Sequence, residues 1–154
     1  INLFFEKEGS ENHLIDLGGE LISRGKNFIT NKSWSIGIEK PSESTSTRKI
    51  FDIIELNNQA LATSGNYRKY RIDKETNQKY VHSINPLNGR PARSNILSVS
   101  VKASDCMTAD AFATALMVMP LNMGKKLVDE IPNVEALWII SKSKNFVTHS
   151  SKNW

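Results

Sequence analysis

Residues 96–119 read ILSVSVKASDCMTADAFATALMVM, and this stretch decides the class of fold. Residues 96–101 alternate large apolar side chains with serine, a period of two that is typical of a half-buried β-strand. Residues 107–119 follow the period of a helix instead, and Pro120 ends it. The apolar face expected for this helix comprises Met107, Ala111, Phe112, Ala115, Leu116 and Val118. The stretch therefore predicts a strand followed by an amphipathic helix.

Short strands are predicted on both sides of this stretch. Before it, apolar or alternating runs predict strands at residues 13–17, 34–38, 50–56, 60–62 and 79–84. After it, a second helix is expected at 123–131, followed by a strand at 136–140 that pairs with 146–147. Residues 3–9 resemble the last turn of a helix, ended by a glycine. The order of elements predicts one α+β domain over residues 1–154, with a largely antiparallel sheet.

Glycine and asparagine mark the predicted turns. Gly18 and Gly19 follow a strand directly, a position that needs either a positive φ or a close backbone approach. Asn57 and Asn58 separate two strand-like runs and favour a hairpin or another tight connection. A further turn is predicted at residues 85–91, which combine Asn, Pro and Gly.

Composition excludes several classes of protein. The chain has 154 residues, a formal charge of +4 and 39% hydrophobic residues, typical of a globular domain. No apolar run approaches the roughly 20 residues that span a bilayer. Lysine and arginine are scattered, so nucleic-acid binding is not predicted, although the charge would favour a small anionic ligand. The single cysteine, Cys106, excludes an internal disulfide.

Asp110 and Thr114 are the first candidate site. They are four residues apart, so on a helix they lie on the same face, one turn from each other. A carboxylate and a hydroxyl supply hard oxygen ligands of the kind that bind Mg²⁺. Alternatively, the aspartate stabilises the start of the helix and the threonine hydrogen bonds to the carbonyl of residue i−4. The spacing alone leaves both readings open.

Two further segments contain candidate ligand-binding residues. Residues 81–91 present His82, a residue type that can carry a proton because the unperturbed pKa of histidine lies near neutrality, and Arg90, which suits a phosphate contact. A structural histidine and an exposed turn arginine are the alternatives. Residues 63–70 begin with small hydroxyls followed by glycine and could present backbone N–H groups to an anion.

Taken together and in order, these segments resemble the ApbE family of FAD:protein FMN transferases. The resemblance covers residues 13–140 and rests on the following short runs: Ile15-Asp16-Leu17-Gly18-Gly19, Trp34-Ser35-Ile36-Gly37-Ile38, Thr63-Ser64-Gly65-Asn66-Tyr67, His82-Ser83-Ile84-Asn85-Pro86 with Gly89-Arg90-Pro91, and Thr108-Ala109-Asp110 with Thr114.

The resemblance implies a function and a role for each candidate residue. It implies that FMN is transferred from FAD to a threonine hydroxyl of a target protein and that AMP is released. Asp110 and Thr114 are then the Mg²⁺ ligands, His82 lies near the reacting phosphate or the acceptor hydroxyl, and Ile84 contacts FAD. The implied partners are acceptor flavoprotein subunits of membrane redox complexes. The implied location is the bacterial cell envelope, on the periplasmic side, reached through a lipoprotein anchor that this chain does not contain.

Two departures and the length of the chain qualify this expectation. Asn85 stands where the family often has aspartate, and Ala113 where some members have an acidic residue. Further metal and FAD contacts are expected N-terminal to Ile1, so we expect the chain to be the C-terminal portion of an ApbE-like domain that binds FAD weakly by itself. FAD pyrophosphatase activity, giving FMN and AMP, and an inactive flavin-binding or structural module are the alternatives.

Overall fold

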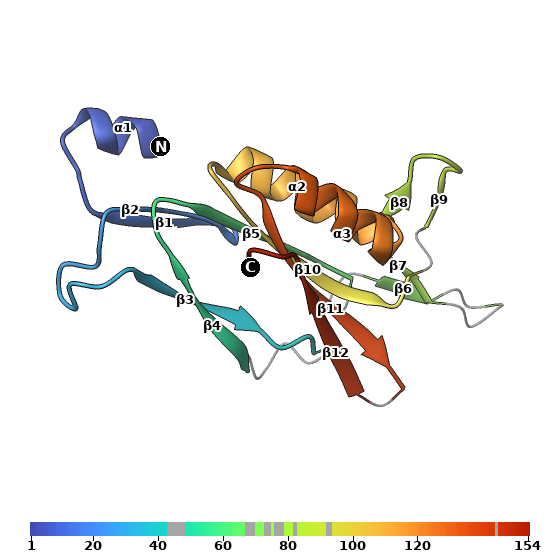
Figure 1. Ribbon diagram of the computed structural model, residues 1–154. Coiled ribbons are helices and arrows are strands. Elements are labelled where there is room, and N and C mark those ends of the chain that lie inside the picture. Colours follow the sequence, from blue (N-terminus) through green and yellow to red (C-terminus); the bar gives the residue numbers. More distant parts are fainter. Residues whose placement is uncertain are drawn as a thin grey trace.

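A six-stranded antiparallel sheet forms the centre of the molecule (Figure 1). The computed structural model describes residues 1–42, 49–66, 70–72, 75, 79–81, 83–91, 94–143 and 145–154. The sheet has the order β1-β2-β5-β10-β11-β12, and every neighbouring pair is antiparallel. Its strands are β1 His13–Leu17, β2 Glu20–Arg24, β5 Ala60–Gly65, β10 Ile96–Ala103, β11 Glu135–Lys142 and β12 Asn145–Ser150. The prediction of an α+β fold with a largely antiparallel sheet is confirmed.

Two helices follow β10 and cover one face of this sheet (Figure 1). They are α2, Cys106–Val118, and α3, Leu121–Glu130, which Pro120 separates. The side of α2 that packs on β5 and β10 carries Ala109, Ala113, Leu116 and Met117, all fully buried. The predicted apolar face was therefore wrong for Met107, Ala111 and Ala115, which are exposed, and right for the buried Leu116. Alanine is buried instead because its small side chain lets the helix approach the sheet closely.

A separate hairpin covers the opposite face of the sheet. Its strands, β3 Trp34–Glu39 and β4 Ile50–Leu56, pair with each other and lie on the side away from α2 (Figure 1). Their buried side chains meet those of β5 and β11 in a second hydrophobic core that comprises Ile36, Ile38, Leu56, Leu61, Leu137 and Ile139. β11 is therefore buried on both faces, which explains its continuous apolar sequence.

The turn residues behave partly as predicted. Gly18 and Gly19 have φ of 73° and 105° and connect β1 to β2 as a two-residue hairpin turn. Asn58 also has a positive φ, of 53°, but β4 and β5 lie in different sheets, so this turn is a tight connection and not a hairpin. β2 was not predicted, because it is short and interrupted by serine and arginine.

Two small hairpins lie between β5 and β10 in the sequence. β6 Tyr70–Ile72 pairs with β7 Lys79–Val81, and β8 Ile84–Asn85 pairs with β9 Arg90–Pro91. The predicted turn at 85–91 is the β8–β9 turn, where Gly89 has φ of 65°. In the part of the chain that the structure describes, no helix is both long and apolar enough to cross a membrane.

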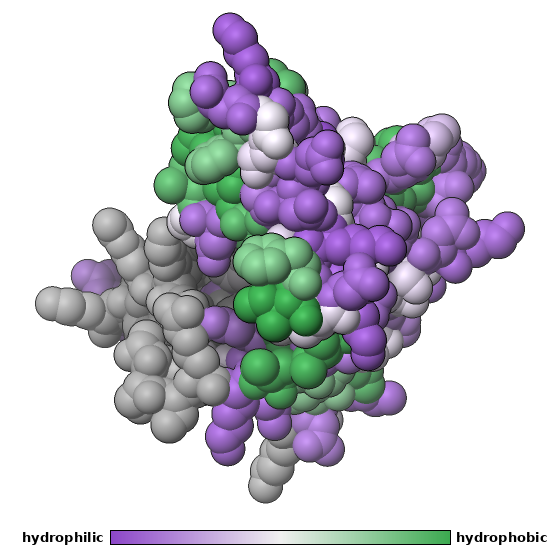
Figure 2. All heavy atoms as spheres, turned by 90° about the vertical axis from the view of Figure 1, so that its left-hand side faces the viewer, coloured by the Kyte–Doolittle hydropathy of each residue, from purple (hydrophilic) through white to green (hydrophobic). Residues whose placement is uncertain are grey.

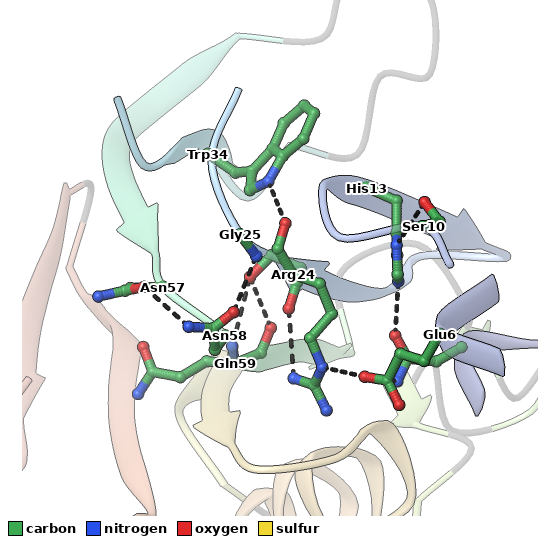
Figure 3. Close-up of polar contacts among 11 residues, drawn as sticks. Glu6, Ser10, His13, Arg24, Gly25, Trp34, Asn57, Asn58 and Gln59 are labelled. Atoms are coloured by element: carbon green, nitrogen blue, oxygen red, sulfur yellow. Dashed lines mark hydrogen bonds and ion pairs between the residues drawn. The ribbon is translucent and has the colours of Figure 1, made fainter. Parts of the chain in front are cut away.

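The short helix α1, Asn2–Lys7, is held against the sheet by polar contacts (Figure 3). The Arg24 guanidinium on β2 donates to Glu6, and this hydrogen-bonded ion pair holds the pKa of the Glu6 carboxyl below its usual range. His13 hydrogen bonds to both Ser10 and Asn2. Next to them, the Trp34 indole N–H donates to the Arg24 carbonyl at 3.0 Å. These contacts connect α1, β1, β2 and the β3–β4 hairpin.

The same end of the molecule exposes large hydrophobic side chains. Leu3 and Phe4 of α1 are 77% and 62% exposed, and Phe28 and Ile29 in the connection before β3 are 78% and 82% exposed. Figure 2 faces this end and shows hydrophobic patches among hydrophilic side chains. A groove of about 600 Å³ lies between α1, β1, β2 and the start of α2. α1 thus leaves part of the apolar face of β1 and β2 open.

Candidate metal and flavin site

A hydrogen-bonded cap fixes where α2 begins. Asp105 has an extended backbone, and its carboxylate accepts from the Thr108 backbone N–H at 2.8 Å and from the Thr108 hydroxyl at 2.9 Å. These hydrogen bonds lower the pKa of the Asp105 carboxyl, since they favour its charged form. The cap satisfies a backbone N–H that the first turn of α2 would otherwise leave without a partner, and so stabilises the start of the helix.

Asp110 and Thr114 lie one turn apart on α2, as their spacing predicted, and the structure places both on its exposed side. Both side chains are exposed, whereas their neighbours Ala109 and Ala113 are fully buried against the sheet. The small side chains of Ala109 and Ala113 therefore allow α2 to pack closely on the sheet. A carboxylate and a hydroxyl are left accessible on one helical face.

The Thr114 hydroxyl is hydrogen bonded to a residue of the sheet. Its Oγ1 lies 3.1 Å from Oγ of Ser64, which belongs to β5. The alternative interpretation was that the Thr114 hydroxyl hydrogen bonds to the carbonyl of residue i−4. The structure instead shows a hydrogen bond to Ser64. Sequence reasoning did not identify Ser64 individually, because 50 residues separate it from Thr114. Its only signal was its place in the Thr63-Ser64-Gly65 run.

The Asp110 carboxylate and the Thr114 hydroxyl are exposed oxygen groups of the chemical type that hard divalent cations bind. One carboxylate and hydroxyl oxygens suit Mg²⁺, which usually takes one or two protein carboxylates and completes its coordination with water and phosphate. Among the described residues, no group of three or more His, Cys, Asp and Glu side chains could hold a metal. Water and a ligand's phosphates would therefore supply most of the coordination of an ion bound to Asp110.

The first three residues of the predicted anion-binding segment at 63–70 do not form a loop. Thr63, Ser64 and Gly65 belong to β5 and pair with Ser100, Val99 and Ser98 of β10. The interpretation as a nest of free N–H groups was wrong for these three residues, because sheet pairing determines their backbone. Tyr67 lies outside the described residues.

Asn66, directly after β5, contacts the segment of the sequence that contains the candidate residues His82 and Ile84. Asn66 is buried, with 5% exposure, and its Oδ1 accepts from the Ser83 hydroxyl at 3.0 Å. Ile84 follows Ser83 directly, begins β8 and is 51% exposed, so it is accessible to a ligand. His82 lies outside the described residues, and its predicted role stays a prediction. β5 thus contacts both the α2 candidate pair, through Ser64, and the β8 segment, through Asn66.

The departure at Asn85 has a structural explanation. Its Oδ1 accepts from the Leu87 backbone N–H at 2.9 Å and so closes the turn between β8 and β9. Aspartate and asparagine both form this type of turn, because each supplies the same acceptor oxygen. Asparagine at this position is therefore compatible with the predicted site.

A second cavity lies on the other face of the sheet. Its volume is about 640 Å³, and its lining includes Asp16, Gly18, Gly19, Ile36, Gly37 and Thr63. Two of the short runs quoted above, at 15–19 and 34–38, therefore meet at this cavity and not at Asp110 and Thr114. The Asp16 carboxylate accepts from the Gly19 backbone N–H at 3.0 Å, which supports the hairpin turn.

Comparison with known proteins identifies relatives over nearly the whole chain. The FAD:protein FMN transferase of Vibrio cholerae is 36% identical over 151 residues, 98% of this chain and 43% of the relative. That of Haemophilus influenzae is 36% identical over 146 residues, 95% of this chain and 41% of the relative. The chain thus spans less than half the length of these curated relatives.

Solved structures agree with the sequence comparison. The flavin transferase ApbE from Vibrio cholerae matches with a TM-score of 0.78 and 34% identity, over 98% of this chain and 46% of that one. The apo form of the flavinyl transferase ApbE from Pseudomonas stutzeri matches with a TM-score of 0.78 and 28% identity, over 98% and 45%. The model of the ApbE family matches residues 1–138. This chain belongs to the ApbE family.

Proposed function

We propose that this chain is the C-terminal part of a magnesium-dependent FAD:protein FMN transferase. The enzyme would transfer FMN from FAD to a threonine hydroxyl of an acceptor protein and release AMP. The observation that carries the proposal is the group of oxygen ligands formed by Asp110 and Thr114, with Ser64 hydrogen bonded to Thr114, on the accessible side of α2. The names of the curated relatives supply the reaction class.

In the proposed reaction, one P–O bond forms to the acceptor protein while another P–O bond, within FAD, breaks. The threonine oxygen of the acceptor forms a bond to the phosphorus of the FMN half, the P–O bond to AMP breaks, and the hydroxyl proton leaves the acceptor. Bound Mg²⁺ would neutralise negative charge that develops on the phosphates. Asp110 and Thr114 would hold the ion, and His82 would accept the proton, as its ordinary pKa near neutrality permits.

The remaining proposed contacts concern the flavin and the acceptor. Ile84 offers an apolar side chain that is half exposed at the start of β8, suited to packing against FAD. The proposed acceptors are flavoprotein subunits of membrane redox complexes, and the proposed location is the periplasmic side of the bacterial cell envelope. A radiolabelled lipid precursor incorporated into the protein as encoded in full would support a lipoprotein anchor, and absence of label would contradict it.

The proposed activity is testable with one substitution and a matched control. In the protein as encoded in full, incubated with FAD, Mg²⁺ and a threonine-containing acceptor, we expect the acceptor mass to increase by FMN less one water, with release of AMP. Asp110→Ala should lower the rate by roughly 100-fold or more, because the charge on the phosphates would no longer be neutralised. Asp52→Ala removes an exposed carboxylate on the β3–β4 hairpin and should leave the rate unchanged.

Three other outcomes would each be informative. Free FMN without a mass increase on the acceptor would identify the reaction as hydrolysis of FAD. Unchanged rate and unchanged Mg²⁺ dependence in Asp110→Ala would show that the metal assignment is wrong. No FAD turnover by the unsubstituted protein under any metal condition would contradict the enzyme proposal itself.

A further inference from the structure

We propose that Ser64 is a positioning residue that turns the Thr114 hydroxyl toward the metal, a role that rests on the function proposed above. Ser64 would not contact the FAD bound to the metal ion. It would act through Thr114, by accepting a hydrogen bond that the Thr114 hydroxyl donates, so that the oxygen lone pairs of Thr114 remain available to the cation. The 3.1 Å separation of the two hydroxyl oxygens is the observation that carries this inference.

The framework around the two hydroxyls is rigid on both sides. Ser64 lies within the β5–β10 ladder, paired with Val99, which is fully buried. Thr114 follows Ala113, which is fully buried where α2 packs on the sheet. Each hydroxyl is therefore attached to backbone that sheet pairing or helix packing holds in place, and the distance between them is set by the tertiary fold.

The chemistry of a threonine ligand explains why it needs such a partner. A hydroxyl has one proton and two lone pairs, so an oxygen that binds a cation must direct its proton elsewhere. In a helix, a free threonine hydroxyl tends to donate to the carbonyl of residue i−4, which here is Asp110. Ser64 offers an acceptor on the sheet side instead. Outer partners that orient a metal ligand in this way commonly change metal affinity by 10- to 100-fold when removed.

A neighbouring threonine provides a matched control. Thr63 precedes Ser64 on β5, so its side chain points to the other face of the sheet, where its hydroxyl lies 2.8 Å from that of Ser100. Thr63→Ala and Ser64→Ala each remove one hydrogen-bonded hydroxyl from the same strand, β5. Only Ser64→Ala removes the contact to Thr114. A difference between the two variants would therefore report on the metal site and not on the sheet.

The experiment measures metal affinity directly as well as through turnover. In the protein as encoded in full, Mn²⁺ binding is followed by the electron paramagnetic resonance signal of the free ion, and the rate of FMN transfer is titrated with Mg²⁺. We expect Ser64→Ala to weaken Mn²⁺ binding and to raise the Mg²⁺ requirement by roughly 10- to 100-fold, with a smaller change in the rate at saturating Mg²⁺. Ser64→Thr, which keeps a hydroxyl on a strand, should restore most of the affinity, and Thr63→Ala should bind Mn²⁺ as tightly as the unsubstituted protein.

The outcomes separate this inference from the proposed function. Unchanged metal affinity in Ser64→Ala, together with a large loss in Asp110→Ala and Thr114→Ala, would overturn the role of Ser64 alone. Unchanged affinity in all three variants would overturn the metal site itself. If Ser64→Ala does not fold, Ser64→Cys replaces it, since sulfur is of similar size but a weak acceptor, and the same weakening of metal binding is expected.

Discussion

At the scale of single residues, Asp105 is the side chain that most directly determines how α2 begins. Its carboxylate accepts hydrogen bonds from both the backbone N–H and the hydroxyl of Thr108. We expect Asp105→Ala to lower the free energy of unfolding by about 1 kcal/mol at neutral pH, the usual cost of losing an N-cap. Urea denaturation of both proteins would measure the difference, and Asp16→Ala, which removes an exposed turn carboxylate outside the helix, gives a comparison.

The same residue predicts a pH dependence with a definite sign. The pKa of Asp105 is lowered in the folded protein, so its stabilising contribution is fully present above the pKa of the unfolded chain. That contribution is lost as the pH falls through the lowered folded pKa, when the carboxylate becomes protonated. The difference in unfolding free energy between the unsubstituted protein and Asp105→Ala should therefore shrink below about pH 4. A difference that grows on acidification would contradict the assignment.

Cys106, the next residue, has the opposite shift. Burial raises the pKa of its thiol, and the carboxylates of Glu20 and Asp105 raise it further. The thiol also donates to the Leu21 carbonyl at 3.3 Å. Because the thiolate is the reactive form, we expect iodoacetamide to modify Cys106 in the native protein more slowly at pH 7.5 than in the protein unfolded in urea. Equal rates in the two states, measured by mass spectrometry, would show that the environment described here does not protect the thiol.

At the scale of elements, the contact between α2 and β5 decides how the candidate site is assembled. It brings Thr114 to Ser64 while Ala109 and Ala113 fill the interface. Ala109→Leu should destabilise the protein by roughly 1–3 kcal/mol, because a larger side chain has no space between helix and sheet. Ala111→Leu changes the same residue type on the exposed side of α2 and should have little effect. Thermal unfolding of the two variants would test which face is buried.

At the scale of the whole molecule, β11 couples two hydrophobic cores. Trp138 belongs to the core under α2, and Leu137 and Ile139 belong to the core under the β3–β4 hairpin. Ile139→Ala should cost about 2–5 kcal/mol and lower protection from hydrogen exchange on both faces together, because one strand serves both. Ile53→Ala on β4, a residue that is 64% exposed, should be nearly neutral. Loss of protection on the hairpin face alone would indicate two independent units.

Local patterns in the sequence accounted for most of the elements. Alternation identified β10 and the continuous apolar run identified β11, because a strand repeats every two residues and a strand buried on both faces needs no polar side. Spacing of four placed Asp110 and Thr114 on one side of a helix, and the structure shows both exposed there. Gly18 and Gly19 marked the end of β1 and suited the positive φ that both adopt, although the hairpin with β2 was not predicted. These features depend only on neighbours along the chain.

Only the tertiary structure determined which residues of α2 are buried, which strands pair with each other, and which distant residues come into contact. The alanines on the buried side of α2 were predicted wrongly because they look no more apolar than the exposed ones, and only the close approach of β5 and β10 selects Ala109 and Ala113. Asn57 and Asn58 indicate a turn but not that β4 and β5 join different sheets. The contact of Ser64 with Thr114 joins positions 50 residues apart, and the order of strands in the sheet, not the chemistry of either residue, brings them together.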